Sequence, residues 1–122
     1  MAISSLPADG RVAPLSPQVF QVLLSLHNGP LHGYSIIQDI RQRTADEIRL
    51  TASTLYDALA RLVDQGLIEE IDAPAAEGQD SRRRYYRITK PGRQVAQLEV
   101  QRLERLIRMA RATGVVRKGA SR

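Results

Sequence analysis

The basic run in DSRRRYYRIT, residues 80–89, offers the clearest chemistry in the sequence. Three consecutive arginines, Arg82 to Arg84, stand directly before two tyrosines. Guanidinium groups bind phosphate oxygens through paired hydrogen bonds. The run therefore fits a phosphate-clamping catalytic loop, a nucleic-acid-binding hairpin, a processing site or a solvated loop. No nucleophile or base accompanies the arginines, which argues against the catalytic loop.

Other candidates for catalysis are few. His27 and His32 are the two histidines, five residues apart, and the nearest acid on the following segment is Asp39. A metal site needs at least a third converging ligand, and a Ser-His-Asp triad needs an oriented base. The chain has no cysteine, no Gly-rich phosphate loop and no dinucleotide fingerprint. We therefore expect no enzyme activity, no metal site and no cofactor, and a structural role for His32 at the start of a helix.

Positive charge is concentrated in the last third of the 122-residue chain. Residues 1–81 hold five Arg against eleven Asp or Glu, whereas residues 82–122 hold eleven Arg and two Lys against Glu99 and Glu104. This segregation favours a polyanionic partner, nucleic acid or an anionic membrane, over a generic solubility charge. No stretch approaches the roughly 20 apolar residues of a membrane span, and the N-terminus lacks a signal-peptide core. Without cysteine for disulfides, a soluble cytoplasmic protein is expected.

Hydrophobic periodicity and capping residues predict the elements that position these groups. Short helices are expected at residues 17–27, 32–44 and 51–66, strands at 67–72 and 83–89, and a long helix at 90–113. Ser16, Thr51 or Ser53, and Thr89 are the expected N-caps. The stretch between the strands, residues 73–81, suits a flexible hairpin tip.

Three helices followed by a hairpin is the order of a winged helix-turn-helix domain. The predicted fold class is mainly α with a small β-hairpin: a winged helix-turn-helix plus a long C-terminal dimerisation helix. We divide the chain into a flexible N-terminal arm (1–15), a winged helix-turn-helix DNA-binding domain (16–89), a C-terminal dimerisation helix (90–114) and a basic tail (115–122).

The third helix is expected to enter the DNA major groove, and the hairpin to hold the DNA backbone. The apolar face of this third helix consists of Leu55, Ala58, Leu59 and Leu62. Its outward face therefore carries Ser53, Thr54, Tyr56, Asp57, Ala60 and Arg61. Hydroxyls at a helix start bond phosphates or base edges, although one of them suffices merely to cap the helix. Arg61 is the single cation of this helix, so the wing arginines, extended by Arg87, Lys90 and Arg93, are expected to supply much of the electrostatic affinity.

The wing tyrosines are assigned by strand alternation. Tyr86 and Ile88 are expected to face inward, and Tyr85 and Arg87 outward. Tyr85 and Tyr56 are then the better candidates for reaching phosphate through the phenol hydroxyl.

The last helix carries more apolar surface than it needs to pack on a small domain. Its residues Ala96, Val100, Leu103, Ile107 and Ala110 follow the a/d spacing of a helix–helix seam. A symmetric dimer through this seam is better supported than packing on the chain's own domain alone or an amphipathic membrane-binding helix.

At this point the sequence resembles the PadR family of bacterial transcriptional regulators. The matching segments are LHGYSI (31–36), STLYDALARLVDQGLIE (53–69) and RRYYRITKPGR (83–93), which occur in family order over about two thirds of the chain. The resemblance implies a winged-helix repressor of the small subgroup, dimerising through its single C-terminal helix. It also implies that Tyr34 lies in the region that meets DNA, and that a small ligand or stress signal controls binding. The wing loop has GQDSRRR where relatives commonly begin with Gly-Arg-Pro.

We therefore predict a sequence-specific regulator, a repressor that binds a palindromic operator in double-stranded DNA as a homodimer, in the cytoplasm and on the nucleoid when bound. The alternative is a winged-helix module whose basic surface binds an acidic protein. The last helix has no Trp, Phe or Tyr to stack on an aromatic effector. The predicted DNA-binding residues are Tyr34, Thr51, Ser53, Thr54, Tyr56, Asp57, Arg61, Arg82, Arg83, Arg84, Tyr85 and Lys90.

Overall fold

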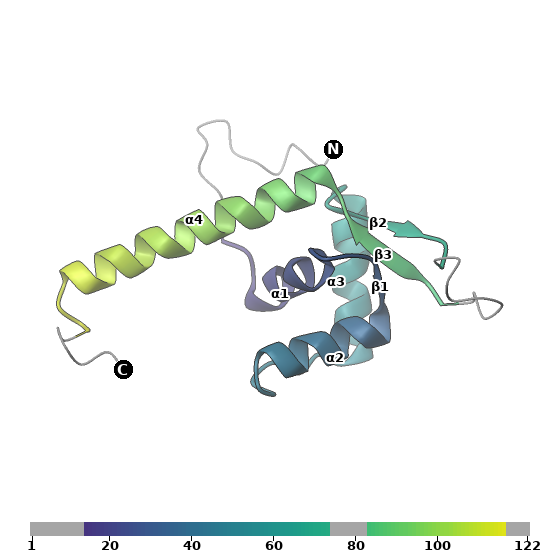
Figure 1. The fold of residues 1–122 in the computed structure, drawn as a ribbon, viewed down its shortest axis with the longest axis horizontal. Coiled ribbons are helices and arrows are strands. Elements are labelled where there is room, and N and C mark those ends of the chain that lie inside the picture. The colour runs from purple at the N-terminus through teal and green to yellow at the C-terminus, as the bar shows by residue number, and fades with distance from the viewer. Residues whose placement is uncertain (1–13, 74–82, 117–122) are drawn as a thin grey trace.

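Four helices and three short strands make up residues 14–73 and 83–116, the part of the chain that the computed structural model describes (Figure 1). Most of the predicted N-terminal arm, Arg82 and most of the basic tail lie outside these residues. The elements are α1 (Pro17–Leu26), β1 (Leu31–His32), α2 (Gly33–Arg43), α3 (Ala52–Asp64), β2 (Ile68–Ile71), β3 (Tyr85–Ile88) and α4 (Lys90–Ala112). The predicted order of three helices, a hairpin and a long helix is confirmed.

The helices begin where the capping residues predicted. The hydroxyls of Ser16, Thr51 and Thr89 each accept a hydrogen bond from the backbone N–H three residues further on. The ring of His32 does the same for α2, because its Nδ1 accepts from the backbone N–H of Ser35 at 3.3 Å. These bonds satisfy donors that have no partner within the first turn of a helix. The expected structural role of His32 is confirmed.

An aliphatic core joins α1, α2, α3 and the sheet. The predicted inner face of α3 is confirmed, since its four apolar residues are all buried. α1 and α2 supply the other large side chains of this core, and the sheet closes it. The fully buried large aliphatic side chains are Val22, Leu23, Leu26, Ile36, Ile40, Leu55, Leu59 and Ile68.

The sheet has one more strand than predicted. β1 pairs antiparallel with β3, with His32 opposite Tyr85, and β2 pairs antiparallel with the other edge of β3, with Glu69 opposite Arg87. The order is therefore β1-β3-β2, with β3 in the centre. The sequence predicted a two-stranded hairpin because β1 is only two residues long and has no alternating pattern of its own.

The central position of β3 corrects one predicted exposure. Tyr86 and Ile88 are buried as expected, but Tyr85 is only 5% exposed, so the expectation that its outward face is open to solvent is wrong. Its ring packs edge-on against the ring of His32, with centroids 5.3 Å apart. Strand alternation alone assumes that one face stays open, whereas β1 brings His32 beside Tyr85.

α4 starts at a tight junction with the base of the sheet. The Thr89 hydroxyl donates to the Gly66 carbonyl at 2.7 Å, and the Thr89 N–H donates to the Leu67 carbonyl at 3.1 Å. Gly92 lies so close that an added Cβ would be 2.0 Å from the Leu67 oxygen. This close approach fixes the direction in which the long helix leaves the domain.

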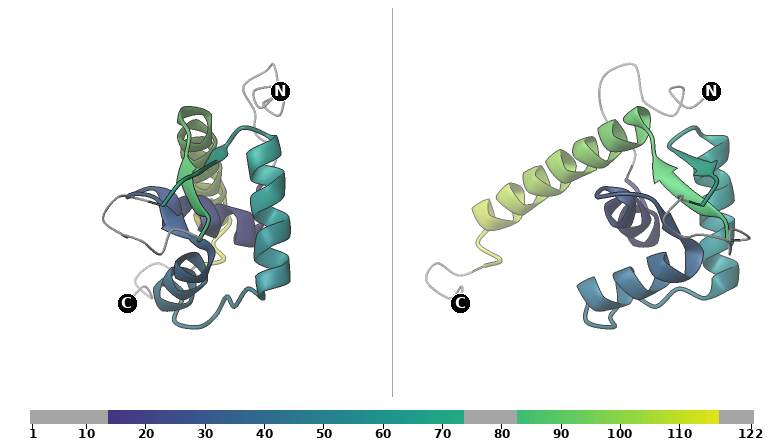
Figure 2. Two further views of the ribbon diagram at one scale, coloured as in Figure 1. Left: turned by 90° about the vertical axis from the view of Figure 1, so that its right-hand side faces the viewer. Right: turned by 45° about the vertical axis from the view of Figure 1, so that its right-hand side comes forward.

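The first half of α4 packs on α1, and the second half extends away from the rest of the molecule (Figure 1; Figure 2, right). Where the two helices meet, Glu99 is 2% exposed and forms an ion pair with Arg102 at 2.6 Å. Hydrogen bonds from Arg102 hold the pKa of the Glu99 carboxyl below its usual value despite its burial. None of the described helices is both long enough and apolar enough to cross a bilayer.

Candidate nucleic-acid interface

The outward face of α3 presents polar side chains from its first turn onward. Ser53, Thr54, Tyr56, Asp57 and Arg61 are all exposed, as helical periodicity predicted. Thr51 is also exposed, but the cap uses its hydroxyl, which accepts from the Thr54 backbone N–H and donates to the Thr54 Oγ1 at 3.0 Å. The hydroxyl of Ser53 makes no hydrogen bond to any described residue, so of the three it is the most available to a ligand.

Two exposed tyrosines lie on α2 and α3, near the point where the two helices meet. Tyr34 is 65% exposed on α2, and its hydroxyl oxygen accepts a hydrogen bond from Gln38 at 3.2 Å. Tyr56 is 47% exposed, and its phenol end lies over Gly33 at the start of α2. The contact between α2 and α3 at this point is therefore made by Tyr56 on a glycine, whereas Tyr34 is largely exposed.

If duplex DNA binds at this face, the change Gly33→Ala should weaken that binding while leaving the fold stable. An added Cβ would lie 2.3 Å from the Tyr56 hydroxyl oxygen, so the phenol must swing away. Because the obstacle is the end of a side chain, the free energy of unfolding should change by less than about 1 kcal/mol. Loss of one contact worth about 1 kcal/mol should lower duplex affinity roughly fivefold. Thermal unfolding and fluorescence anisotropy titration measure the two quantities.

The double variant shows whether Gly33→Ala acts through Tyr56. In a Tyr56→Ala background, Gly33→Ala should have no further effect on DNA affinity. An equal loss in both backgrounds would mean that residue 33 affects binding by another route.

The arginines at the described start of the wing already have partners within the sheet. Arg83 Nη1 lies 3.2 Å from His32 Nε2, and Arg84 Nη1 lies 3.0 Å from a carboxylate oxygen of Glu70. Further along β3, Arg87 donates two hydrogen bonds to one oxygen of Glu69. The wing is thus less strongly cationic than its sequence suggests, since the acids of β2 lie across from its arginines.

Lys90 does not join the wing arginines. It is the first residue of α4, at the opposite end of β3 from Arg84, and four strand residues span about 13 Å. Its neighbour on the helix, Arg93, instead donates to the His27 carbonyl at 3.3 Å. In the structure, Lys90 and Arg93 therefore do not lie beside Arg83 and Arg84, and the predicted extension of the wing surface is not formed.

A notch of about 410 Å3 lies between one side of α3 and the wing. Tyr56, Ala60 and Val63 of α3 line one side, and Glu70 of β2 and Tyr86 of β3 line the other. Burial raises the pKa of Tyr86, and the nearby Glu70 carboxylate adds to the effect while Arg84 opposes it. The Glu70–Arg84 pair thus lies at the same surface as the outward side of α3.

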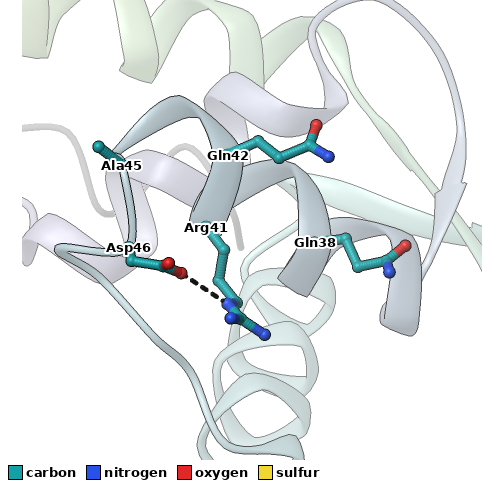
Figure 3. Close-up of a pocket in the computed structure, with 5 residues that line it drawn as sticks. All are labelled: Gln38, Arg41, Gln42, Ala45 and Asp46. Carbon is teal, nitrogen blue, oxygen red and sulfur yellow. Dashed lines mark hydrogen bonds and ion pairs between the residues drawn. The ribbon is translucent and has the colours of Figure 1, made fainter.

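Another pocket, of about 320 Å3, lies at the C-terminal end of α2 (Figure 3). Its cation, Arg41, forms an ion pair with Asp46 at 2.8 Å, which holds the pKa of that carboxyl below its usual value. Gln38, Gln42 and Ala45 complete the lining, and none is a nucleophile or a base. Within residues 14–73 and 83–116, no three His, Asp or Glu side chains gather as a metal site would require.

Sequence reasoning missed one residue and one contact beside the candidate surface. Arg49 is exposed two residues before the cap Thr51, and its ion pair with Asp46 is long, at 3.8 Å. His32 links the start of α2 to Arg83 of the wing. The position of Arg49 just before a helix cap was a usable signal, whereas the contact of His32 with the wing spans 51 residues of sequence and has no local signature.

The predicted seam on α4 is divided between two environments. Val100 and Ile107 are 40% and 51% exposed, and the neighbouring Leu106 and Met109 are 44% and 56% exposed. Ala96 packs partly against the core of its own domain. Leu103 and Ala110 are half-buried. The uncovered apolar surface therefore lies mainly along the second half of α4, where the helix extends beyond the domain.

One family model and two curated proteins match the sequence of this chain. The family model described as "Transcriptional regulator PadR-like family" matches residues 22–98, from α1 into α4. Two curated proteins, from Streptomyces fradiae and Lysinibacillus sphaericus, are 35% and 36% identical to the chain over 85 and 62 residues. The chain spans only 22% and 55% of their respective lengths.

Solved structures share the fold over most of the chain. A transcriptional regulator from Clostridium thermocellum is 29% identical with a TM-score of 0.67, covering 78% of this chain and 87% of that one. A PadR family regulator from Clostridium difficile is 22% identical with a TM-score of 0.70, covering 80% and 98%. Bacillus subtilis PadR in complex with operator DNA is 24% identical with a TM-score of 0.59, covering 69% and 46%.

Proposed function

The chain belongs to the PadR-like family of transcriptional regulators, and we propose that it represses transcription by binding a palindromic operator as a homodimer. The observation that carries the proposal is that the exposed face of α3 and the wing border one notch, with Tyr56 on the helix side and Glu70, paired with Arg84, on the wing side. The family consists of transcriptional regulators and not of enzymes. Operator binding by Bacillus subtilis PadR, which has the same fold, adds support.

In the proposed complex, α3 enters the major groove with its N-terminal turn foremost. Ser53 and Thr54 would contact phosphates or base edges, and Arg61, further along the exposed face, a base edge or phosphate. Tyr56 follows this turn on α3 and Tyr34 lies next to Gly33 at the start of α2, and their hydroxyls would reach the DNA backbone. Tyr85 is not included, because it is buried against His32.

Dimerisation through α4 would set the spacing of the two recognition helices. The exposed apolar side chains of α4 support this proposal, because a second copy would remove them from water. Two-fold symmetry would then place the α3 helices about 34 Å apart, one turn of DNA. The proposed division of labour is a DNA-binding unit at residues 16–89 and a dimerisation helix at residues 90–114.

Repression would follow from exclusion of polymerase from the operator, on the nucleoid within the cytoplasm. We extend the proposal to release by a small ligand or a stress signal that changes the angle between the two DNA-binding units. Within one chain that angle depends on the Gly92 junction and on the packing of α4 around Glu99 and Arg102.

Selection of bound duplexes from a random pool tests the proposal directly. We expect enrichment of an inverted repeat whose half-sites are about 10 base pairs apart, bound far more than tenfold tighter than scrambled sequence. Affinity should fall steeply as salt rises. Arg84→Ala should weaken binding to every sequence, whereas Ser53→Ala should alter sequence preference. Equal binding of selected and scrambled duplexes would contradict the operator proposal. It would favour the alternative, a winged-helix module whose basic surface binds an acidic protein.

A further inference from the structure

The acidic residues of β2 stand close to the basic residues of β3. Glu70 pairs with Arg84 at 3.0 Å, and Glu69 pairs with Arg87 at 2.5 Å. A guanidinium group next to a carboxylate presents little net charge to a third ion. The attraction between Arg84 and a DNA phosphate is therefore at its full strength only when Arg84 has separated from Glu70, or when Glu70 carries no charge.

The two pairs lie on opposite faces of the hairpin. Neighbouring strand residues point to opposite faces, so Glu69 and Glu70 face different directions. Glu70 lines the notch with Tyr56, Ala60 and Val63, on the α3 side of the wing, while Glu69 lies directly opposite Arg87 on the other side. In the proposed complex, a duplex that contacts both α3 and the wing would lie across this notch, on the face that carries Glu70 and Arg84 and not on the face that carries Glu69 and Arg87.

The exposure of the Glu70–Arg84 pair makes it exchangeable. The Arg84 side chain is 72% exposed and the Glu70 side chain 38% exposed, and pairs of this kind hold their partners weakly. The pair of Glu99 and Arg102, with side chains 3% and 21% exposed, is by contrast part of the packed junction between α1 and α4. A phosphate can thus compete with Glu70 for Arg84 without disturbing the fold.

We propose that Glu70 is a built-in competitor of DNA phosphate: a tethered carboxylate that occupies Arg84 in the free protein and lowers the affinity and salt dependence of DNA binding. The inference rests on the proposed function and names a residue that regulates the same surface. It predicts that the wing behaves as if it had one cation fewer than its sequence contains. Glu69, on the opposite face, has no such effect.

The test uses the full chain and a duplex of unrelated sequence, titrated over a salt series. Glu70→Gln keeps the side-chain shape and removes the charge. It should tighten binding roughly five- to tenfold at about 0.1 M salt and steepen the slope of log K against log salt by close to one. Glu69→Gln removes the same charge from the same strand, and should change affinity by less than about twofold. Melting curves check that both variants fold.

The Arg84→Ala background isolates the pair. There Glu70→Gln should change DNA affinity by less than about twofold, because the Arg84 guanidinium for which Glu70 and phosphate compete is absent. The inference is overturned if Glu70→Gln does not tighten binding, if Glu69→Gln tightens it equally, or if the effect survives without Arg84. If the wild type binds no duplex at any salt concentration, the proposed function fails and the inference fails with it.

Discussion

Replacing Ile107 with Glu is expected to convert a dimer into a monomer and to weaken operator binding at least about 100-fold. Ile107 is 51% exposed within one chain, so the change should leave the domain itself folded. In the proposed dimer the same side chain lies in an apolar seam, where an unpaired carboxylate costs several kcal/mol. Once the seam is lost, each half-site is bound by a separate monomer. The increase in operator affinity that comes from linking two DNA-binding domains then disappears.

Sedimentation at micromolar concentration and titration of the selected operator measure the two effects. Gln101→Glu is the matched control, since it places the same charge on an exposed position of the same helix and should leave assembly unchanged. A variant Ile107→Glu that sediments as the wild type does, or that binds the operator with unchanged affinity, would contradict dimerisation through this face of α4.

The change Gly92→Ala is expected to have the largest effect on stability. An added Cβ would lie 2.0 Å from the Leu67 carbonyl oxygen and 2.8 Å from Ile88 Cγ1. The Leu67 carbonyl accepts the Thr89 N–H, so it cannot move without opening the junction between sheet and helix. Forced overpacking of this kind costs about 3 kcal/mol. We expect the midpoint of thermal unfolding to fall by roughly 10 °C or more.

Gly33→Ala is the matched control for this prediction. It adds the same methyl group at the start of another helix, but its nearest neighbour is the end of the Tyr56 side chain and not a backbone carbonyl. The two variants should therefore differ widely in unfolding midpoint. Similar midpoints would show that the close approach at Gly92 is relieved by a shift of α4, and α4 would then be less rigidly attached than its contacts indicate.

Most of the fold could be predicted from the sequence because its signals are local. The spacing of Leu55, Leu59 and Leu62 determined which face of α3 is buried, and a hydroxyl at Thr89 marked the start of α4. The exposed polar residues of α3 followed from the same periodicity. A cap and a helical repeat each depend on residues within one or two turns, so they can be recognised without knowledge of the rest of the molecule.

The candidate site was predicted less completely, because electrostatics depends on neighbours that are distant in sequence. The run Arg82 to Arg84 looked like free positive charge, yet Glu70 and His32 lie against two of these residues. Glu70 is 14 positions from Arg84, and no local pattern connects them. Only the register of β2 against β3 reveals the competition.

Hydrophobic periodicity and capping residues were sufficient to predict the order of the helices, the inner face of α3 and the excess of apolar residues on α4, since burial and capping act along the chain. Tertiary structure alone decided that β3 is a central strand. It therefore also decided that Tyr85 is buried, because strand pairing joins residues such as His32 and Tyr85 across more than fifty positions. It also decided which arginines are paired with acids, because an ion pair depends on distance in space and not on distance in sequence.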